Sequence, residues 1–594
     1  MPKSPSKSLP SWNLSDLFKG TTDPKIDQLI KTQSKKADVF AKTYRGKIAK
    51  LTPKRLAEAL ATYESILQQT CKPEQFAYLL FSADMKHPEH GPLLQKTEKA
   101  GLEIFQKLVF LEVELAQMSD AQLKTLERAQ ALRPYQHFLE EQRINKKHRL
   151  SEAEERIMND KSLTGRSAFV RLFDEELANK AFQFPEGTKM GMKTESGLLD
   201  LLHSPKREER KEAAKWFTKG LREELHRLTF VTNTLLQDKQ TDDRYRKFPT
   251  SEAKRHVDNE ITQEMVDAMT AAVTKSYHLV QDFYEFKRRV LGVKTVYDYD
   301  RYAPVAESSA TYSYDDAQKI VLDAFKKFDP RMAKIAGTFF EKNWIDAKPQ
   351  LGKRGGAYCM FVTPDLHPYV FMNYTGRLTD VKTLAHELGH AVHASLARKQ
   401  TFLNFDMPLT VAETASVFGE MLVFDQLREA ITDRTEKFAL YMEKIESIFA
   451  TVHRQTSMYL FERDLHAASR EQGELSSEAI SALWRKRQLE MFGTSVTLTS
   501  DYDIWWSYIS HFVHTPFYVY SYAFGELLTL ALFNVYKERG SSMTKDYMDM
   551  LSKGGVVSPA ELVKPFGINL SNPTFWEGGI RMIEELIEEA KKLY

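Results

Sequence analysis

The sequence has 594 residues, which is enough for roughly three to four domains or for one large fold with several lobes. Apolar residues make up 42% of it, aromatic residues 11% and charged residues 28%, so a mainly disordered, collagen-like or low-complexity chain is excluded. Because 83 Lys and Arg nearly balance 81 Asp and Glu, the formal net charge of +2 predicts no binding to nucleic acid or to an anionic membrane.

Cysteine usage and hydropathy predict where the protein works. The chain has only two cysteines, Cys71 and Cys359, so a disulfide framework and a thiolate zinc site are excluded and a reducing compartment is favoured. Residues 1–10 lack the apolar core of a signal peptide, and no run of about 18 apolar residues occurs. We therefore expect a soluble cytoplasmic protein, with no obligate protein partner implied.

The first part of the chain is patterned for helices. From about Asp27 to Arg166, charged and apolar residues alternate at helical spacing, and one apolar stripe consists of Ile104, Leu108, Leu111 and Leu115. Residues 185–187 (Pro-Glu-Gly) indicate a turn between two short strands that contain Phe182, Phe184 and Met190. A boundary near residues 196–205 predicts an N-terminal helical lobe at 1–200 and a catalytic region at 201–594.

Helical patterning resumes at residues 206–292 and returns after Asp380. Between them, residues 352–373 are rich in glycine and aromatic residues, which favours strands near Tyr358–Val362 and Val370–Tyr374. The final helix buries one apolar stripe, formed by Ile583, Leu586, Ile587 and Ala590. The pattern predicts a mainly α fold with one small sheet.

The strongest chemical signal is the segment His386-Glu387-Leu388-Gly389-His390. Residues i and i+4 share a helix face, so His386 and His390 can bind one zinc ion. Glu387 lies beside them, where it can deprotonate a water molecule whose pKa the metal lowers. With 16 His in the chain, the motif would occur by chance with a probability of only about 3%. The pattern predicts one zinc ion per chain, on a helix whose expected N-cap is Asp380.

The third zinc ligand decides the class of site. Metzincins need Gly at position 393 and His at 396, whereas this sequence has His393 and Leu396, so that class is excluded. His393 lies about 10.5 Å along the helix axis from His386, too far for a shared ion, so we expect a supporting role for it.

Glu413 is the better candidate, because it lies on a second apolar-patterned helix, in residues 409–416, that can cross the first. The alternative is a capping box, in which Thr410 and Glu413 only satisfy backbone amides. Glu420 is seven residues further on and faces the same way, so it is a candidate partner of a ligand histidine and the reserve third ligand.

A third cluster consists of aromatic residues and histidines between Tyr502 and Phe524. Most of these rings are expected in the core. However, its two histidines, His511 and His514, and its tyrosines carry donors of the kind that a tetrahedral oxyanion needs; the tyrosines include Tyr508, Tyr518, Tyr520 and Tyr522. Residue patterns alone leave open which of them serves as a donor.

The segments HELGHAVH, ETASVFGE and HFVHTPFYVYSYAFG resemble the zinc oligopeptidases of the thimet type, peptidase family M3, and most closely the oligoendopeptidase F branch. SWNLSDLF near the N-terminus and LLDLLHSPKREERKEAAKWF near residue 200 extend the resemblance over most of the chain.

The resemblance implies specific roles for these residues. His386, His390 and Glu413 would bind zinc, and Glu387 would be the general base and proton shuttle. Tyr522 matches the tyrosine that donates to the oxyanion, while the match of His511 and Tyr518 to the other donors is only approximate. The sequence departs from the thimet pattern at residues 514–517 (His-Thr-Pro-Phe), which replace a glycine-rich loop, so the identity of the second oxyanion donor stays open. His514 and Tyr518 are also candidates for substrate binding.

The resemblance also implies a two-lobed helical, zincin-like body with a deep substrate channel and a small sheet beside the zinc helix. The sheet edge would hold an extended peptide. Gly355, Gly356 and Ala357 permit such a close approach of backbones, although each glycine alone could equally mark a surface turn.

The leading hypothesis is a zinc-dependent endopeptidase that cleaves internal bonds of short, unstructured oligopeptides. A zinc carboxypeptidase of related helical fold is the alternative, since the chain has many arginines that could fix a terminal carboxylate. A non-catalytic, zinc-stabilised peptide-binding scaffold is disfavoured by Glu387, because a structural site needs no base.

Overall fold

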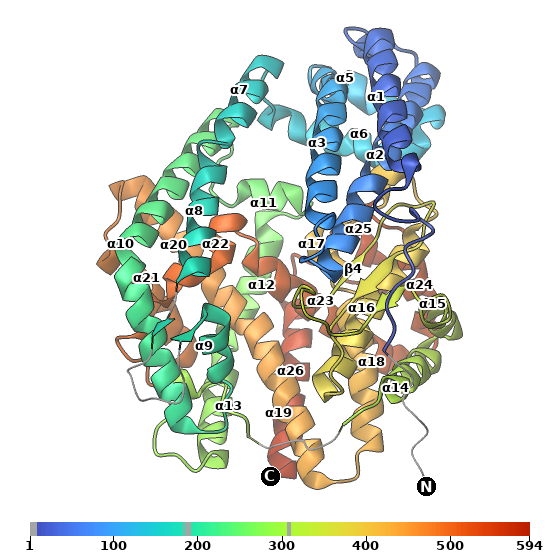
Figure 1. Cartoon of the computed structure of the whole chain (residues 1–594). Coiled ribbons are helices and arrows are strands. Elements are labelled where there is room, and N and C mark those ends of the chain that lie inside the picture. The colour runs from blue at the N-terminus through green and yellow to red at the C-terminus, as the bar shows by residue number, and fades with distance from the viewer. Residues whose placement is uncertain (1–8, 181, 184–191, 306–310) are drawn as a thin grey trace. The chain divides into compact units, whose positions relative to one another are not determined.

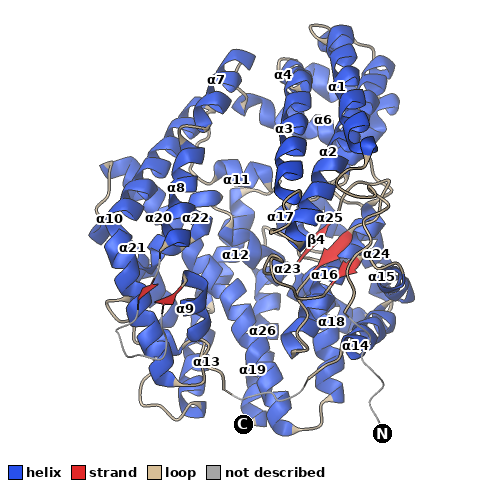
Figure 2. Cartoon of the chain, viewed as in Figure 1, coloured by secondary structure: helices blue, strands red, loops and turns tan. Residues whose placement is uncertain are grey.

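The computed structural model describes residues 9–180, 182–183, 192–305 and 311–594. The described chain is mainly helical and contains two small sheets, which confirms the expected fold class (Figure 2). The contacts between residues divide the chain into two compact units. Unit 1 comprises residues 1–152, 309–430 and 535–568, and unit 2 comprises residues 153–308, 431–534 and 569–594. These units interleave along the chain, whereas the expected division into 1–200 and 201–594 is consecutive and stays a prediction, as does the expected channel.

Unit 1 begins with helical hairpins and continues with the sheet and the helix of the H-E-x-x-H motif. Its helices are α1 Pro24–Tyr44, α2 Pro53–Ala83, α3 His90–Leu108, α4 Phe110–Ala116, α5 Asp120–Glu127, α6 Gln136–Asn145, α14 Tyr314–Phe328, α15 Pro330–Glu341, α16 Leu378–Ala397, α17 Leu409–Ala412, α18 Ser416–Ala430, α24 Ser542–Leu551 and α25 Pro559–Val563. Helices α1, α2 and α3 lie side by side, in blue in Figure 1.

The apolar stripe expected near residue 108 is buried in the core of these hairpins. Ile104 and Leu108 lie at the end of α3, and Leu111 and Leu115 lie on α4. Val109 separates the two helices but keeps helical backbone angles, with φ −53° and ψ −28°. The spacing of the stripe is therefore preserved across the junction.

The sheet of unit 1 has three strands in the order β3-β5-β4: β3 Ile345–Asp346, β4 Tyr358–Met360 and β5 Tyr369–Phe371. The two strands expected from the sequence, β4 and β5, are confirmed and pair antiparallel, with Cys359 opposite Val370. Strand β3 pairs parallel to β5 and was not expected, because two residues are too few for a periodic signal. Strands β4 and β5 both contact α16, so the sheet lies beside the motif helix (Figure 2).

Unit 2 is built around the long helix α10. Its elements are α7 Glu152–Ser162, α8 Arg166–Asn179, β1 Phe182–Gln183, β2 Met192–Lys193, α9 Glu195–Leu201, α10 Arg207–Tyr245, α11 Ala253–Asp258, α12 Gln263–Lys275, α13 Tyr277–Val290, the short 3-10 helix η4 Asp298–Asp300, α19 Arg434–Thr451, α20 His453–Gln472, α21 Ser477–Phe492, the 3-10 helix η6 Tyr502–Tyr508, α22 Ser510–His514, α23 Val519–Arg539, which continues into unit 1, and α26 Pro573–Leu593.

Two sequence-based expectations in unit 2 can be compared with the structure. Strands β1 and β2 pair antiparallel, with Phe182 opposite Lys193, as expected for a hairpin. The expected turn at 185–187, together with Phe184 and Met190, lies outside the described residues. The final helix α26 buries its predicted stripe against α12 and α19. No helix in the described ranges combines the length and apolar character that crossing a membrane requires.

Candidate metal centre

Helix α16 carries the H-E-x-x-H motif, and its first turn is held by Asp380. The carboxylate Oδ2 of Asp380 accepts the backbone N–H groups of Thr375 (2.7 Å) and Arg377 (3.0 Å). Asp380 is thus the third residue of the helix and Arg377 is the N-cap, which corrects the prediction that Asp380 is the N-cap. The carboxylate binds amides before the helix rather than within it, so the helix starts three residues earlier than expected.

Two glycines bring α16 and α18 into close contact. A Cβ atom on Gly389, inside the motif, would lie 2.4 Å from the carbonyl oxygen of Ala415 and 2.6 Å from Cα of Ser416. A Cβ on Gly419 would lie 3.0 Å from the carbonyl oxygen of Ala385. Only glycine permits this spacing. The crossing therefore delivers the segment around residue 415 directly to the face of the motif helix.

Glu413 lies in this segment, in a turn rather than within a helix. The sequence suggested one helix over residues 409–416, but α17 ends at Ala412 and α18 begins at Ser416. The turn is held from outside, since the Tyr547 hydroxyl donates to the carbonyl oxygen of Thr414 (2.8 Å). Helix α17 begins after Pro408, so Thr410 lies within this helix and is not its N-cap.

The structure brings His386, His390 and Glu413 together. Glu413 Oε2 lies 3.4 Å from Nε2 of His386 and 3.4 Å from Nε2 of His390. The three ligand atoms lie within 4.8 Å of one another. In a tetrahedral site with metal–ligand bonds of about 2.05 Å, ligand atoms are about 3.3 Å apart. The residues present therefore fit a metal ion of this kind, with a coordination position left for water or substrate.

Polar side chains orient two of these groups. Ser416 Oγ donates to Glu413 Oε2 (2.6 Å), the oxygen that faces both histidines. Glu420 Oε1 lies 2.6 Å from Nδ1 of His386, on the side of the ring away from Glu413. A hydrogen bond from Nδ1–H leaves the Nε2 lone pair facing the site. Ser416 was not singled out in the sequence, although a hydroxyl three residues after a ligand carboxylate is a recognisable signal.

Neighbouring charges shift the pKa values of His386 and Glu413 in opposite directions. Burial lowers the pKa of His386, but the hydrogen bond and charge of Glu420, with the charges of Glu413 and Glu387, raise it to about 10. Burial raises the pKa of Glu413, but the hydrogen bond and charge of His390 and the charge of His386 lower it well below its ordinary value. The site is thus strongly attractive to a cation.

Glu387 occupies a different environment from Glu413. It is 5% exposed, and its Oε2 atom has no hydrogen-bond partner among the described residues. Burial raises the pKa of Glu387, against the opposing charges of His386 and His390. A buried carboxylate with an open oxygen beside a metal centre is suited to exchange a proton with a reactant.

His393 is buried one turn beyond His390. Burial and the neighbouring charge of His390 lower its pKa to about 3, so the ring is neutral. Within the described chain its Nδ1 has no hydrogen-bond partner, and it does not belong to the metal-binding group. It packs in the core of unit 1.

Strand β4 borders the motif helix. The rings of Phe361 and His390 have centroids 6.4 Å apart, and burial and the charge of Glu387 raise the pKa of Cys359. Gly355, Gly356 and Ala357 precede this strand, which is at an edge of the sheet. Gly356 has φ +81°, and the space where a Cβ would stand on Gly355 or Gly356 is open.

The aromatic cluster lies in unit 2. His511 Nε2 is 3.3 Å from the Tyr522 hydroxyl, and the Tyr518 and Tyr522 rings meet edge to face with centroids 4.8 Å apart. All three side chains are half-buried, so their polar atoms can reach a ligand. Burial lowers the pKa of His511, and the charges of His514 and Arg454 lower it further.

Tyr520 and His514 lie close to these three residues in the sequence but are in different environments. Tyr520 is fully buried, and its hydroxyl lies 3.0 Å from His256 Nδ1 and accepts a hydrogen bond from Asn259 Nδ2 (2.8 Å). It is a core residue. His514 is exposed, and its Nε2 lies 2.7 Å from Asp174 Oδ1 on α8.

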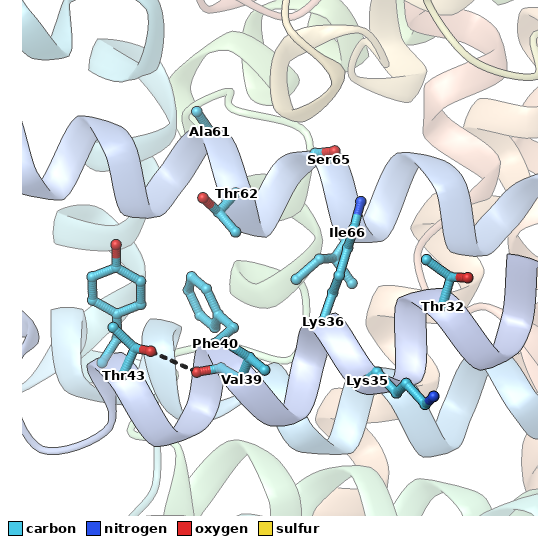
Figure 3. A pocket seen from close by; sticks show the side chains of 11 residues that line it. Thr32, Lys35, Lys36, Val39, Phe40, Thr43, Ala61, Thr62, Ser65 and Ile66 are labelled. Atoms are coloured by element: carbon cyan, nitrogen blue, oxygen red, sulfur yellow. Dashed lines mark hydrogen bonds between the residues drawn. The ribbon is translucent and has the colours of Figure 1, made fainter.

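An open groove of about 760 Å³ lies between α1 and α2, far along the chain from the motif (Figure 3). It is lined by Phe40, Val39 and Ile66 together with Lys35, Lys36 and several hydroxyl groups. None of the candidate catalytic or metal-binding residues lines it.

A helix that presents two histidines and a buried glutamate, crossed by a segment that adds a carboxylate, defines a metal-dependent peptidase with an H-E-x-x-H centre. The comparisons with known proteins agree. The model of peptidase family M3 matches residues 200–582, and a model described as oligopeptidase F matches residues 114–182. The chain belongs to peptidase family M3 and is a metallopeptidase, as its motifs indicated.

Similar proteins cover almost the whole chain. Oligopeptidase PepF of Bacillus subtilis (strain 168) is 25% identical over 603 aligned residues, which cover 100% of this chain and 88% of that protein. An oligoendopeptidase F homolog of Lactococcus lactis is 23% identical and covers 98% of this chain and 97% of that protein.

Solved structures share the fold. A protein from Chlamydophila abortus superposes with a TM-score of 0.85 at 24% identity, covering 98% of both chains. Oligoendopeptidase-F from Enterococcus faecium gives a TM-score of 0.73 at 20% identity, covering 96% of this chain and 98% of that one.

Proposed function

We propose that this protein is a zinc-dependent endopeptidase that hydrolyses internal bonds of short, unstructured oligopeptides in the cytoplasm, with one zinc ion per chain. The observation that carries the proposal is the placement of two histidine nitrogens, each 3.4 Å from one carboxylate oxygen, on a helix that also holds Glu387. The relatives are named as oligopeptidases and oligoendopeptidases, which supports oligopeptide substrates.

Zinc is the metal that this donor set favours, because two imidazoles and one carboxylate with an open fourth position are typical of catalytic zinc. His386, His390 and Glu413 would hold it, and Glu420 would keep the His386 ring in place through Nδ1. When bound, zinc would polarise the scissile carbonyl and lower the pKa of a water molecule.

Glu387 supplies the proton transfers. Its carboxylate takes a proton from the attacking water as the new C–O bond forms, and the carbonyl carbon becomes tetrahedral. When the C–N bond breaks, Glu387 gives this proton to the leaving nitrogen, so the carboxylate is regenerated. Its raised pKa makes it able to keep the proton between the two steps.

Tyr522 is the proposed donor to the oxyanion, with His511 in support. The phenol is half-buried rather than packed in the core, and its hydroxyl lies 3.3 Å from the His511 ring nitrogen. Such a donor is most valuable in the transition state, where negative charge develops on the carbonyl oxygen. We propose that Tyr518 and His514 contact the substrate nearby.

The peptide backbone is proposed to bind along β4. An added strand forms main-chain hydrogen bonds with little dependence on sequence, which suits a peptidase of broad specificity. The open space at Gly355 and Gly356, with Ala357, allows the substrate backbone to approach. An extended strand can be supplied only by an unfolded peptide, so folded proteins are poor substrates.

Mass spectrometry of a defined peptide mixture tests this function. We expect internal cleavage that stops with a chelator, returns with zinc and is absent in Glu387→Gln with bound zinc. Each peptide is offered with a free and with an amidated C-terminus. Equal cleavage of both forms supports an endopeptidase, whereas cleavage of only the free form would show a carboxypeptidase. Unchanged cleavage by Glu387→Gln would contradict the proposed base.

The remaining partner expectations are part of the same proposal. The nearly balanced charge supports the absence of a nucleic-acid or membrane partner. The two cysteines are unpaired in the structure, which supports a reducing compartment.

A further inference from the structure

Unit 2 contains a small cavity of about 30 Å³ between α13, α19, α20 and α21. Its polar lining consists of Tyr284, Arg301, Tyr302, Glu446, His453 and Arg454. None of these residues belongs to the proposed catalytic machinery. A volume of this size holds one water molecule or one ion of similar size.

Arg301 is buried with an incomplete set of hydrogen bonds. Arg301 is the residue directly after η4, and it is only 3% exposed. Its Nε donates to the carbonyl oxygen of Asp298 (2.9 Å). The guanidinium lies over the Tyr502 ring at 4.8 Å and the Phe492 ring at 5.5 Å from the centroids. Nη2, however, has no partner among the described residues. A buried guanidinium N–H without an acceptor is costly, so a missing acceptor is indicated.

Arg454, which also lines the cavity, has the same deficiency. Its Nη1 donates to the Tyr302 hydroxyl (2.5 Å), while its buried Nε has no partner in the described part of the chain. Neither Arg301 nor Arg454 forms an ion pair with a carboxylate of the described residues. Two guanidinium groups thus border one small cavity without a counter-charge.

The acidic residues nearby are already engaged. Glu446 Oε1 accepts a hydrogen bond from the buried ammonium of Lys287 at 2.7 Å. The Asp298 carboxylate accepts the backbone N–H and the hydroxyl of Thr499, both at 2.6 Å. Counting Lys287, Arg301 and Arg454 against these two carboxylates leaves one buried positive charge in excess.

The lowered pKa of the Tyr302 phenol is consistent with this excess positive charge. Burial raises the pKa of Tyr302, but the charges of Arg454 and Arg301 outweigh burial and lower it. A positive field of this strength would stabilise any small anion that enters the cavity. The alternative is that Tyr302 itself ionises and balances the excess positive charge, with only water in the cavity.

We propose that this cavity is a binding site for a single monovalent inorganic anion of halide size, such as chloride, held between Arg301 Nη2 and Arg454 Nε. The volume excludes phosphate, sulfate and peptide carboxylates. His453 is not the donor, because burial and the charge of His278 lower its pKa to about 3 and its Nε2 is paired with Ser276 Oγ (2.9 Å). The anion would join Arg301, which follows η4, to Arg454 on α20.

Bromide is the probe for the site, because it is close to chloride in size and its anomalous scattering identifies it. Crystals of the full-length protein grown in bromide should show one anomalous peak between Arg301 and Arg454. Arg454→Met should abolish it. Arg463→Met is the matched control, since Arg463 lies on the same helix but faces Asp267 (3.9 Å), and it should keep the peak.

Thermal unfolding gives an independent measurement in solution. At constant ionic strength, exchanging gluconate for chloride should raise the Tm of the wild type and of Arg463→Met by roughly 1–3 °C, and should leave that of Arg454→Met unchanged. If wild-type crystals show no bromide in the cavity, or if the wild-type Tm is the same in both salts, the proposal is overturned and Tyr302 becomes the counter-charge. The wild-type data decide even if Arg454→Met does not fold.

Discussion

Gly389 offers the sharpest test of how the fold builds the metal centre. In Gly389→Ala the new Cβ would start 2.4 Å from the Ala415 carbonyl oxygen, whereas ordinary contacts begin near 3.4 Å. The obstacle is backbone, so the segment that carries Glu413 must retreat by roughly 1 Å. The spacing of 3.4 Å between Glu413 Oε2 and the histidine nitrogens now nearly matches the distance of about 3.3 Å that a tetrahedral site needs, and this match would be lost.

The expected result is a loss of both metal affinity and stability. Overpacking of this kind costs about 1–3 kcal/mol, and displacing supporting groups typically weakens metal binding about 10–100-fold. Zinc affinity is measured by competition with a chromophoric chelator, and stability by thermal melts of the zinc-free and zinc-loaded forms. The peptide turnover of the variant should recover partly at high zinc concentration.

Gly337→Ala is the matched control for this experiment. Gly337 lies in α15 of the same unit, and nothing stands within 4 Å of the position of a new Cβ. It should be neutral or slightly stabilising, by up to about 1 kcal/mol, with unchanged zinc affinity. Wild-type zinc affinity and melting temperature in Gly389→Ala would refute the argument that the close crossing of α16 and α18 positions the ligands.

Four further predictions concern the ligands, the donors and the peptide site. Glu413→Gln should bind zinc at least roughly tenfold more weakly in a chelator titration, because a neutral amide oxygen replaces a charged ligand. Tyr522→Phe should lower kcat by about 100-fold or more with zinc content unchanged. Tyr520→Phe should instead lower the free energy of unfolding by roughly 1 kcal/mol, measured by denaturant melts, with kcat intact. Gly355→Ala should raise KM for peptides while its Tm, like that of Gly337→Ala, stays close to the wild type.

Each of these has a contrary outcome. Wild-type zinc affinity in Glu413→Gln would make Glu420 the third ligand. An unchanged kcat in Tyr522→Phe would shift the donor role to His511, His514 or Tyr518. A kcat loss in Tyr520→Phe equal to that in Tyr522→Phe would show that the assay reports general disturbance of α23. An unchanged KM in Gly355→Ala would remove this glycine from peptide binding.

The motif helix could be predicted because its information is local. Two histidines four residues apart and a good helical context specify one face without knowledge of the remaining chain. Glu413 could be named only as a candidate, since its approach depends on a turn that Tyr547 holds from more than a hundred residues away. The helix expected over 409–416 is broken there, because tertiary contacts override a short run of helical propensity.

Other features were beyond the reach of sequence patterns for a related reason. Strand β3 has two residues, and its pairing with β5 gives no periodic signal. Arg301 and Arg454 are ordinary charged residues in the sequence, and only their burial around one cavity marks them. The motif allows any residue at position 389, yet the structure shows that the segment around Ala415, next to Glu413, passes Gly389 too closely for a side chain. Each of these features depends on a contact between residues that are distant in sequence, which a local sequence pattern cannot reveal.

The pH dependence of zinc binding follows from the charges that hold His386. Without a metal, the pKa of His386 is about 10 rather than 6.5, so at pH 7 the ring is protonated and paired with Glu420 and Glu413. Zinc needs its neutral nitrogen, so binding must release about one proton. Affinity should therefore rise by up to about tenfold per pH unit between pH 6.5 and 8.5, as measured by chelator competition.

The raised pKa of His386 also determines how the stability of the zinc-free protein changes with pH. A raised histidine pKa contributes stability to the zinc-free protein that is complete below pH 6.5 and is lost as the pH rises through about 10. Glu413, whose pKa is depressed, stays ionised throughout this range and adds no slope. The difference in Tm between zinc-loaded and zinc-free protein should thus widen from pH 6.5 to 8.5. A zinc affinity and a Tm difference that are both constant over this range would show that His386 is already neutral, and would contradict its raised pKa; the hydrogen bond from Nδ1–H to Glu420 is compatible with either charge state.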